Sequence, residues 1–152
     1  MNADRVKAIY EVAKRPGGPI TWRCESGRSV IYFDVALESE LDERLALSVA
    51  WVPAAHIYKM QLFASDRQWI YRFESNKQHH EHTCEWIRGA HVNFPLPGNS
   101  THGEPETQIP SDNLVMALHM FAERLNIVLP TIDRPPAYQM RWTWREGGAS
   151  DT

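Results

Sequence analysis

The chain has 152 residues, a length typical of a single domain. Apolar residues make up 43% of it and charged residues 23%, values that argue against a disordered chain, a fibrous protein or a disulfide-rich miniprotein. Sixteen Lys and Arg against nineteen Asp and Glu give a formal charge of −3, so the chain as a whole lacks the basic surface of a general nucleic-acid binder.

The first half of the chain changes from a helical period to a strand period. A short helix is predicted over residues 3–14, and the run Pro16-Gly17-Gly18-Pro19 ends it. Beyond that run, apolar residues recur at every second position, which is typical of strands with one buried face. Short connections between these strands indicate an antiparallel meander. We expect strands over residues 20–25, 29–37, 45–51, 58–64 and 69–73.

The second half begins with a polar, histidine-rich stretch over residues 76–82. Residues 84–94 indicate one more strand, and residues 95–110 are expected to form a long loop because they are rich in proline and glycine. Ser111 is the predicted N-cap of a helix that extends to Asn126. Its apolar residues form one stripe: Leu114, Val115, Leu118, Phe121, Ala122 and Leu125. Residues 138–145 alternate again and predict a last strand or an extended arm.

These elements predict an α+β fold. It consists of an antiparallel β-sheet, a meander of five or six strands, with one amphipathic helix packed on one face and a short N-terminal helix. Phe33, Trp51 and Leu118 are expected to meet in its core. Residues 1–145 are predicted to form a single domain, and residues 146–152 a flexible C-terminal tail.

Cysteine usage and hydropathy predict the compartment. The two cysteines are Cys24 and Cys84, whereas secreted scaffolds usually carry more, so we expect reduced thiols. No apolar run approaches the roughly 18 residues that span a bilayer, and residues 1–5 do not resemble a signal peptide. The sequence therefore predicts a cytoplasmic protein that does not enter a membrane.

The first candidate site is the histidine-rich turn together with His91. Imidazole and thiolate are ligands that zinc prefers, and in an extended chain His80, His82 and Cys84 share one face. His91 has the opposite parity, which a bulge at Gly89 would reverse. No spaced zinc motif occurs, so we favour a solvated turn and predict neither a metal ion nor a cofactor.

The same region also suggests chemistry without a metal. Histidines can move protons near neutral pH, and Arg72 can neutralise a phosphodiester. Arg72 and Glu74 are expected on the solvent face of their strand, where the simpler interpretation is an exposed ion pair. The sequence leaves open whether the protein is an enzyme and assigns no catalytic residue.

A third candidate is the alternating segment with Arg141 and Arg145 beside Trp142 and Trp144. Guanidinium and aromatic groups together suit single-stranded nucleic acid or a protein groove, but the alternation fits an edge strand with buried tryptophans better. Nucleophile-elbow, P-loop and dinucleotide-binding motifs are absent from the sequence.

The run from Trp69 to Glu74, the histidine-rich turn and the run Gly89-Ala90-His91-Val92-Asn93 resemble a family of small uncharacterised bacterial proteins carried on phages and other mobile elements. That family has a strand with Arg and an acidic residue, a His-containing loop, a Pro-His-x-His strand, and then a helix with an Asn-Ile…Pro tail. The resemblance covers about residues 69–132. Ala90 and Asn93 replace the proline and the second histidine, so the paired-His feature is broken. The resemblance implies a mobile-element or defence setting and a toxin–antitoxin-like partner, but no reaction.

The sequence thus predicts a small cytosolic interaction or regulatory protein. Its predicted binding residues are Arg72, His80, His82 and His91, beside the 95–110 loop. The expected partner is another protein; the net charge disfavours nucleic acid, and a homodimer would cover exposed strand edges although no residue pattern requires one. The alternative is a phosphodiesterase or ribonuclease that uses these four residues, with or without zinc.

Overall fold

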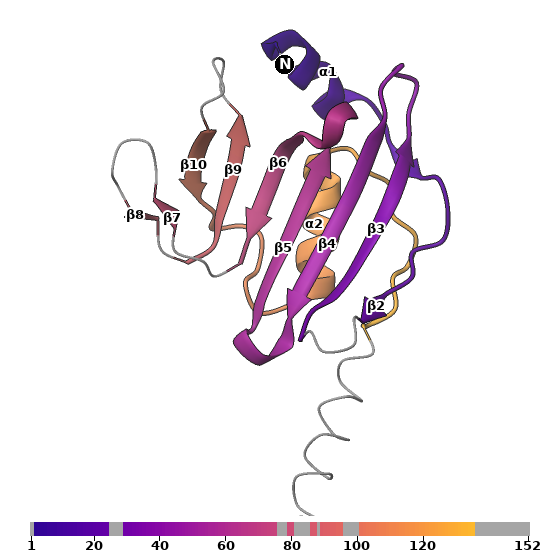
Figure 1. Ribbon diagram of the computed structural model, residues 1–152. Coiled ribbons are helices and arrows are strands. Elements are labelled where there is room, and N and C mark those ends of the chain that lie inside the picture. The colour runs from indigo at the N-terminus through magenta and orange to yellow at the C-terminus, as the bar shows by residue number, and fades with distance from the viewer. Residues whose placement is uncertain are drawn as a thin grey trace, which may run out of the picture.

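The computed structural model describes residues 2–24, 29–75, 79–80, 86–87, 89–95 and 101–135. Over these residues the fold is α+β, with an antiparallel sheet of eight strands, a short N-terminal helix and one later helix (Figure 1). The strand order is β1-β3-β4-β5-β6-β9-β10, and β2 also pairs with β3. The predicted fold class is therefore confirmed, but the expected number of five or six strands is too low, because short strands that the sequence pattern did not indicate join the sheet. The predicted domain end at residue 145 and the tail at 146–152 lie outside the described residues.

The long strands form the centre of the sheet, and the short ones lie toward its edges. The helices are α1 (Ala3–Glu11) and α2 (Leu114–Arg124), and short 3-10 turns cover Pro53–Ala55 and Ser65–Arg67. A separate two-stranded ladder pairs β7 (His79–His80) with β8 (Trp86–Ile87). The strands of the main sheet are β1 (Arg15–Pro16), β2 (Arg23–Cys24), β3 (Ile31–Glu38), β4 (Leu45–Val52), β5 (Ile57–Phe63), β6 (Trp69–Glu74), β9 (His91–Pro95) and β10 (Thr101–Pro105).

Asparagine side chains cap both helices. The Asn2 side chain accepts a hydrogen bond from the Arg5 backbone N–H at 2.8 Å, and Asn113 accepts one from Met116 at 3.0 Å. Asparagine satisfies an N–H group that has no partner inside a first helical turn. The predicted cap at Ser111 is thus wrong, because Asn113 takes that position and α2 begins at residue 114.

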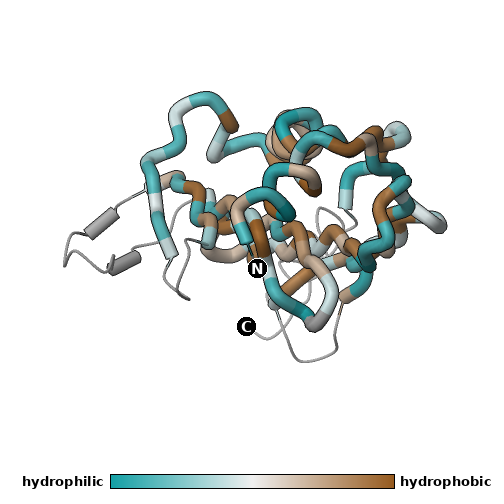
Figure 2. Tube along the Cα trace, turned by 90° about the horizontal axis from the view of Figure 1, so that it is seen from above, coloured by the Kyte–Doolittle hydropathy of each residue, from teal (hydrophilic) through white to brown (hydrophobic). Residues whose placement is uncertain are grey.

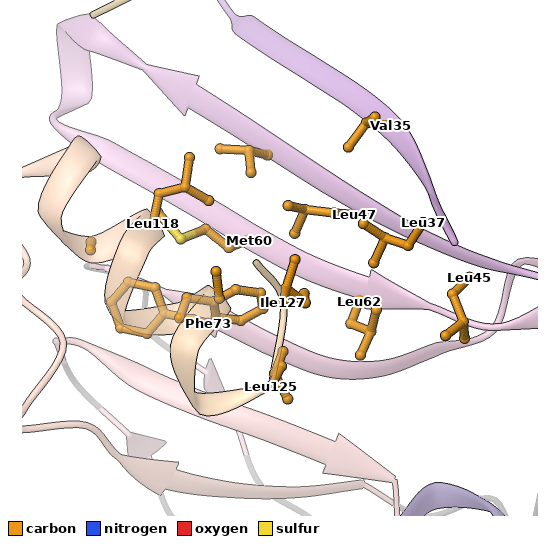
Figure 3. Close-up of a cluster of buried hydrophobic side chains, with 14 of the residues drawn as sticks. Val35, Leu37, Leu45, Leu47, Met60, Leu62, Phe73, Leu118, Leu125 and Ile127 are labelled. Carbon is orange, nitrogen blue, oxygen red and sulfur yellow. The ribbon is translucent and has the colours of Figure 1, made fainter. Parts of the chain in front are cut away.

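Helix α2 packs on one face of the sheet and closes the hydrophobic core (Figure 3). From above, the helix and the sheet form two layers, each with hydrophobic stretches (Figure 2). Phe33 and Leu118 are buried in this core and Trp51 packs against it, as predicted. Alternate residues of the core strands belong to this core: Phe33, Val35, Leu37, Leu45, Leu47, Val49, Met60, Leu62 and Phe73. The period-two pattern therefore marks the covered face correctly.

Three strand predictions are corrected. The expected loop over 95–110 contains β10, whose five residues pair with β9. The expected strand over 20–25 is reduced to β2, and the expected strand over 84–94 is replaced by the short strands β8 and β9. Strand β10 has no apolar alternation, so its place depends on backbone hydrogen bonds to β9 and not on a buried face. The expected strand over 138–145 lies outside the described residues.

A β-bulge near the start of β6 changes which face Trp69 occupies. Strand β6 pairs with β5 in register from Glu74 to Tyr71, and then the register shifts so that Trp69 opposes Phe63. Ile70, the extra residue, is fully buried. The bulge moves Trp69 to the face opposite Tyr71 and Phe73, whereas simple alternation would put all three together.

The face of the sheet opposite α2 is called the open face below. Helix α1 also contacts the covered side, where Tyr10 packs edge-on against Tyr71 at 5.7 Å and Ile9 joins the core. Neither described helix therefore covers the open face (Figure 1). Neither of them has the length and apolar character needed to cross a membrane.

Candidate functional site

Two rows of polar side chains cross the open face where β5, β6 and β9 pair. Arg72 of β6 lies opposite Gln61 on one side and Asn93 on the other, which defines the Arg72 row. Glu74 has Lys59 and His91 as its register partners, which defines the Glu74 row. Because directly opposed Cβ atoms in antiparallel strands are about 5 Å apart, the members of each row are neighbours.

The Glu74 row contains a buried acid–imidazole pair. His91 Nε2 lies 3.1 Å from Glu74 Oε2, and His91 Nδ1 lies 3.0 Å from the carbonyl oxygen of Gly89. The exposed fractions of Glu74 and His91 are 2% and 0%. The prediction that Glu74 lies on a solvated surface is therefore wrong: it lies on the open face, but the fold buries it.

The hydrogen bonds of His91 fix its proton arrangement. The Gly89 carbonyl can only accept, so Nδ1 carries a proton and donates. The contact between Nε2 and Glu74 then needs one more proton between the two atoms, on the imidazole or on the carboxyl group. Both ring nitrogens of His91 are therefore engaged with the protein itself.

Arg72 is the partly exposed member of the cluster. Its guanidinium carbon lies 4.6 Å from the centre of the Trp69 ring, a cation–π contact that the bulge makes available. Arg72 Nε lies 3.8 Å from Glu74 Oε2, too far for a hydrogen bond, and the side chain is 19% exposed. Within the described part of the chain, the buried Nε atom has no hydrogen-bond partner.

Asn93 is fully buried next to Arg72, and among the described residues neither its Oδ1 nor its Nδ2 has a hydrogen-bond partner. Arg72 Nε, Asn93 Oδ1 and Asn93 Nδ2 are called the unpaired trio below. More than nine in ten buried polar groups in proteins are hydrogen-bonded, and each that is not costs about 1–3 kcal/mol. Three such atoms on two adjacent residues therefore make this part of the open face the candidate site for a hydrogen-bonding group.

The structure brings two of the four predicted binding residues together. Arg72 and His91 lie on either side of Glu74, within 3.8 Å and 3.1 Å of the same carboxylate oxygen. The backbone of His80 belongs to β7, but its side chain lies outside the described residues, as does all of His82. Cys84 and the aromatic–arginine segment over 141–145 lie outside them too. No group of three metal-ligating side chains is found within the described ranges.

Sequence reasoning missed Asn93 as a site residue. Asn93 was noted only because a histidine stands there in the similar family. One signal was available: Asn93 has the same parity as His91, so a strand that places His91 on a face places Asn93 there too. Trp69 was missed as well, since no residue pattern predicted the bulge.

Lys14 and Arg124 are two polar residues outside this site whose hydrogen bonds stabilise the fold. Lys14 Nζ donates to the carbonyl oxygens of Val12 and Leu125 at 2.7 and 2.6 Å, and burial lowers the pKa of Lys14 to about 8. Arg124 donates to both carboxylate oxygens of Glu106 and to the Tyr71 hydroxyl, and the Arg124 hydrogen bond lowers the pKa of Glu106. These contacts link the end of α2 to the rest of the chain.

Comparison with known proteins gives no relative from which a role can be taken. No protein-family model matches the chain, and no curated protein and no solved structure matches it. The resemblance to mobile-element proteins stays a prediction, and the function is argued from the open face alone.

Proposed function

We propose that this chain is a small interaction or regulatory protein that works in the cytoplasm and binds another protein through its open face, around Arg72 and Asn93. The observation that supports this proposal is the unpaired trio, three buried polar atoms on two neighbouring residues. A partner that offers hydrogen bonds to these atoms removes their desolvation penalty, so binding at this point is favourable.

The surroundings of the trio suit a protein partner. Trp69 and Arg72 are stacked on the open face, and tryptophan and arginine are the residue types most enriched at interface hot spots. Toward β4 the face carries small side chains, Ala46, Ser48 and Ala50, which let a partner approach the sheet closely. The mobile-element or defence setting, with a toxin–antitoxin-like partner, is part of this proposal and rests on the resemblance alone.

Binding fits the cluster better than catalysis does. A general base needs a free nitrogen within reach of substrate. His91 is fully buried, and both of its ring nitrogens are hydrogen-bonded to Glu74 and Gly89. The imidazole therefore holds β6, β9 and the preceding bend together.

A second candidate function is the phosphodiesterase or ribonuclease. One observation favours it: a guanidinium, a carboxylate and an imidazole meet within 3.8 Å at Arg72, Glu74 and His91. This grouping has the types needed for charge neutralisation and proton transfer. The burial of His91 makes it the weaker candidate.

Site-specific photo-crosslinking in the native host tests the proposal. A photoreactive residue at Ser48 lies on the open face, next to Gln61, whereas one at Met116 lies on α2 and is 54% exposed. We expect a discrete crosslinked protein from position 48, lost on Arg72→Ala, and none from position 116. Equal products from both positions, or none from position 48, contradict the proposal. Cleavage of labelled RNA by the purified protein, abolished by His91→Gln, would support the enzyme instead.

A further inference from the structure

We infer that the open face recognises a primary carboxamide, the side chain of an asparagine or glutamine on the partner protein, between Arg72 and Asn93. This inference rests on the proposed function and names the chemical group that the unpaired trio binds. It is carried by the hydrogen-bonding capacity of the trio and by the geometry of amide pairing.

The trio offers two donors and one acceptor. Arg72 Nε and Asn93 Nδ2 donate, and Asn93 Oδ1 accepts. The complementary group needs an oxygen that accepts twice and an N–H close to that oxygen. A carboxamide has both, because its oxygen carries two lone pairs and one of its N–H bonds lies on the same side as the oxygen. Exchanging the oxygen and nitrogen of Asn93 leaves this count unchanged.

Amide geometry separates a side-chain carboxamide from a peptide bond. Asn93 forms a two-bond ring with a partner amide only if the N–H and the C=O of that amide point the same way. In a trans peptide group they point in opposite directions, and nearly all peptide bonds are trans. An asparagine or glutamine side chain therefore satisfies Asn93 completely, and a partner backbone satisfies only half of it.

A carboxylate satisfies the trio less completely than a carboxamide does. It would place an oxygen against Asn93 Oδ1, where no proton joins the two acceptors. The N–H group of a carboxamide fills that position with a donor.

Access to the trio runs along Arg72. Asn93 is fully buried, whereas the Arg72 side chain is 19% exposed and rests on the Trp69 ring. We expect the arriving carboxamide to displace the aliphatic part of the Arg72 side chain, while the guanidinium group keeps its contact with the Trp69 ring.

An NMR titration of the isotope-labelled full chain with small probes tests the inference. The probes are acetamide, N-methylacetamide, acetate and inorganic phosphate, and the readout is the side-chain NH₂ signal pair of Asn93. We expect a saturable shift with acetamide and roughly tenfold weaker binding of N-methylacetamide, which corresponds to one lost hydrogen bond. Asn113 is the internal control, because its side chain caps α2 far from the open face. Its signals should not move.

Two variants show whether the acetamide response depends on the Asn93 side chain. Asn93→Asp has the same shape but no NH₂ group, and it should abolish the acetamide response measured by backbone signals of β9. Met116→Ala, at an exposed position of α2, should retain it. An equal response to acetamide and N-methylacetamide, a stronger response to acetate or phosphate, or no response at Asn93 overturns the inference. A long-lived water detected at Asn93 that acetamide does not displace overturns it too.

Failure of this inference is distinguishable from failure of the proposed function. If the crosslink from position 48 persists and acetamide has no effect, the carboxamide assignment is wrong and the protein-binding face stands. If the wild-type chain gives no crosslink from position 48, the proposed function is wrong. The crosslinked segment of the partner can also be made as a peptide. If that peptide binds the chain, and a Gln→Glu or Asn→Asp change in the peptide abolishes binding, both proposals are supported.

Discussion

The two faces of the sheet bury their side chains for different reasons. On the covered face, Met60 and Phe73 lie near Leu118 of α2 in a hydrophobic core (Figure 3). On the open face, the most deeply buried side chains are polar: Glu74, His91 and Asn93. Burial of apolar groups stabilises a fold, whereas burial of polar groups costs free energy unless each is paired. Burial on the covered face therefore stabilises the fold, whereas on the open face only the buried polar groups that are paired can do so.

The open face itself divides into a paired row and an unpaired row. Glu74 and His91 satisfy one another at 3.1 Å, while Arg72 Nε and the Asn93 amide in the next row have no hydrogen bond among the described residues. Since the two rows are two residues apart on the same strands, this difference is local. It separates the residues that hold the strands from those that we expect to meet a partner.

The largest effect is expected on the covered face. Phe73→Ala should lower the free energy of unfolding by about 3–5 kcal/mol, because it leaves a cavity against α2 in a fully buried position. Ser48→Ala, at a half-buried position of the open face, should lower it by less than about 1 kcal/mol. Urea unfolding of both variants measures the difference. Equal losses would show that the open face belongs to the core.

The next effect concerns the buried pair on the open face. Glu74→Leu should cost about 3 kcal/mol, because it leaves His91 Nε2 buried without its partner. The double variant Glu74→Leu with His91→Leu should recover part of the loss, since neither polar group then lacks a partner. A double-mutant cycle by urea unfolding measures the coupling. A single variant as stable as wild type would show that the pair does not hold β6 to β9.

A smaller, pH-dependent effect is expected on the covered side at Lys14. Its pKa is about 8 in the folded protein and 10.5 when unperturbed, so between these values the unfolded chain binds more protons. Stability must then rise with pH across this window. From pH 7 to pH 9 the gain should be on the order of 1 kcal/mol in wild type.

Lys14→Met is the matched control for this prediction. It keeps the length of the side chain but removes the titrating group, so the pH-dependent difference between wild type and variant isolates Lys14. Thermal or urea unfolding at several pH values gives that difference. A gain that is the same in both proteins would contradict the burial of a charged Lys14.

The smallest expected change has the opposite sign. Asn93→Leu removes both unpaired amide atoms at similar volume and should raise the free energy of unfolding by about 1 kcal/mol. The same variant should lose the partner crosslink from position 48. Increased stability with lost binding is the signature of a functional residue, whereas a loss of more than about 1 kcal/mol would show that Asn93 supports the fold.

Prediction from the sequence succeeded where one face of an element is apolar. The alternation from Ile31 to Phe73 and the stripe around Leu118 correctly located the sheet, α2 and the core. It failed at β10, which pairs through its backbone alone, and at the bulge at Ile70. For the site, Arg72 and His91 were found from residue type, and Asn93 was missed because a lone asparagine carries no periodic signal.

The amino-acid sequence by itself determined which side chains are buried under α2, because hydrophobic periodicity is a local property that follows from the pleat of a strand. Only the tertiary structure decided that β6 pairs with β9 and so sets Arg72 beside Asn93 and Glu74 beside His91. That pairing is made by backbone hydrogen bonds, and every residue except proline has the backbone N–H group that donates them. The residue types therefore do not specify the register between β6 and β9. The candidate site exists because of this register.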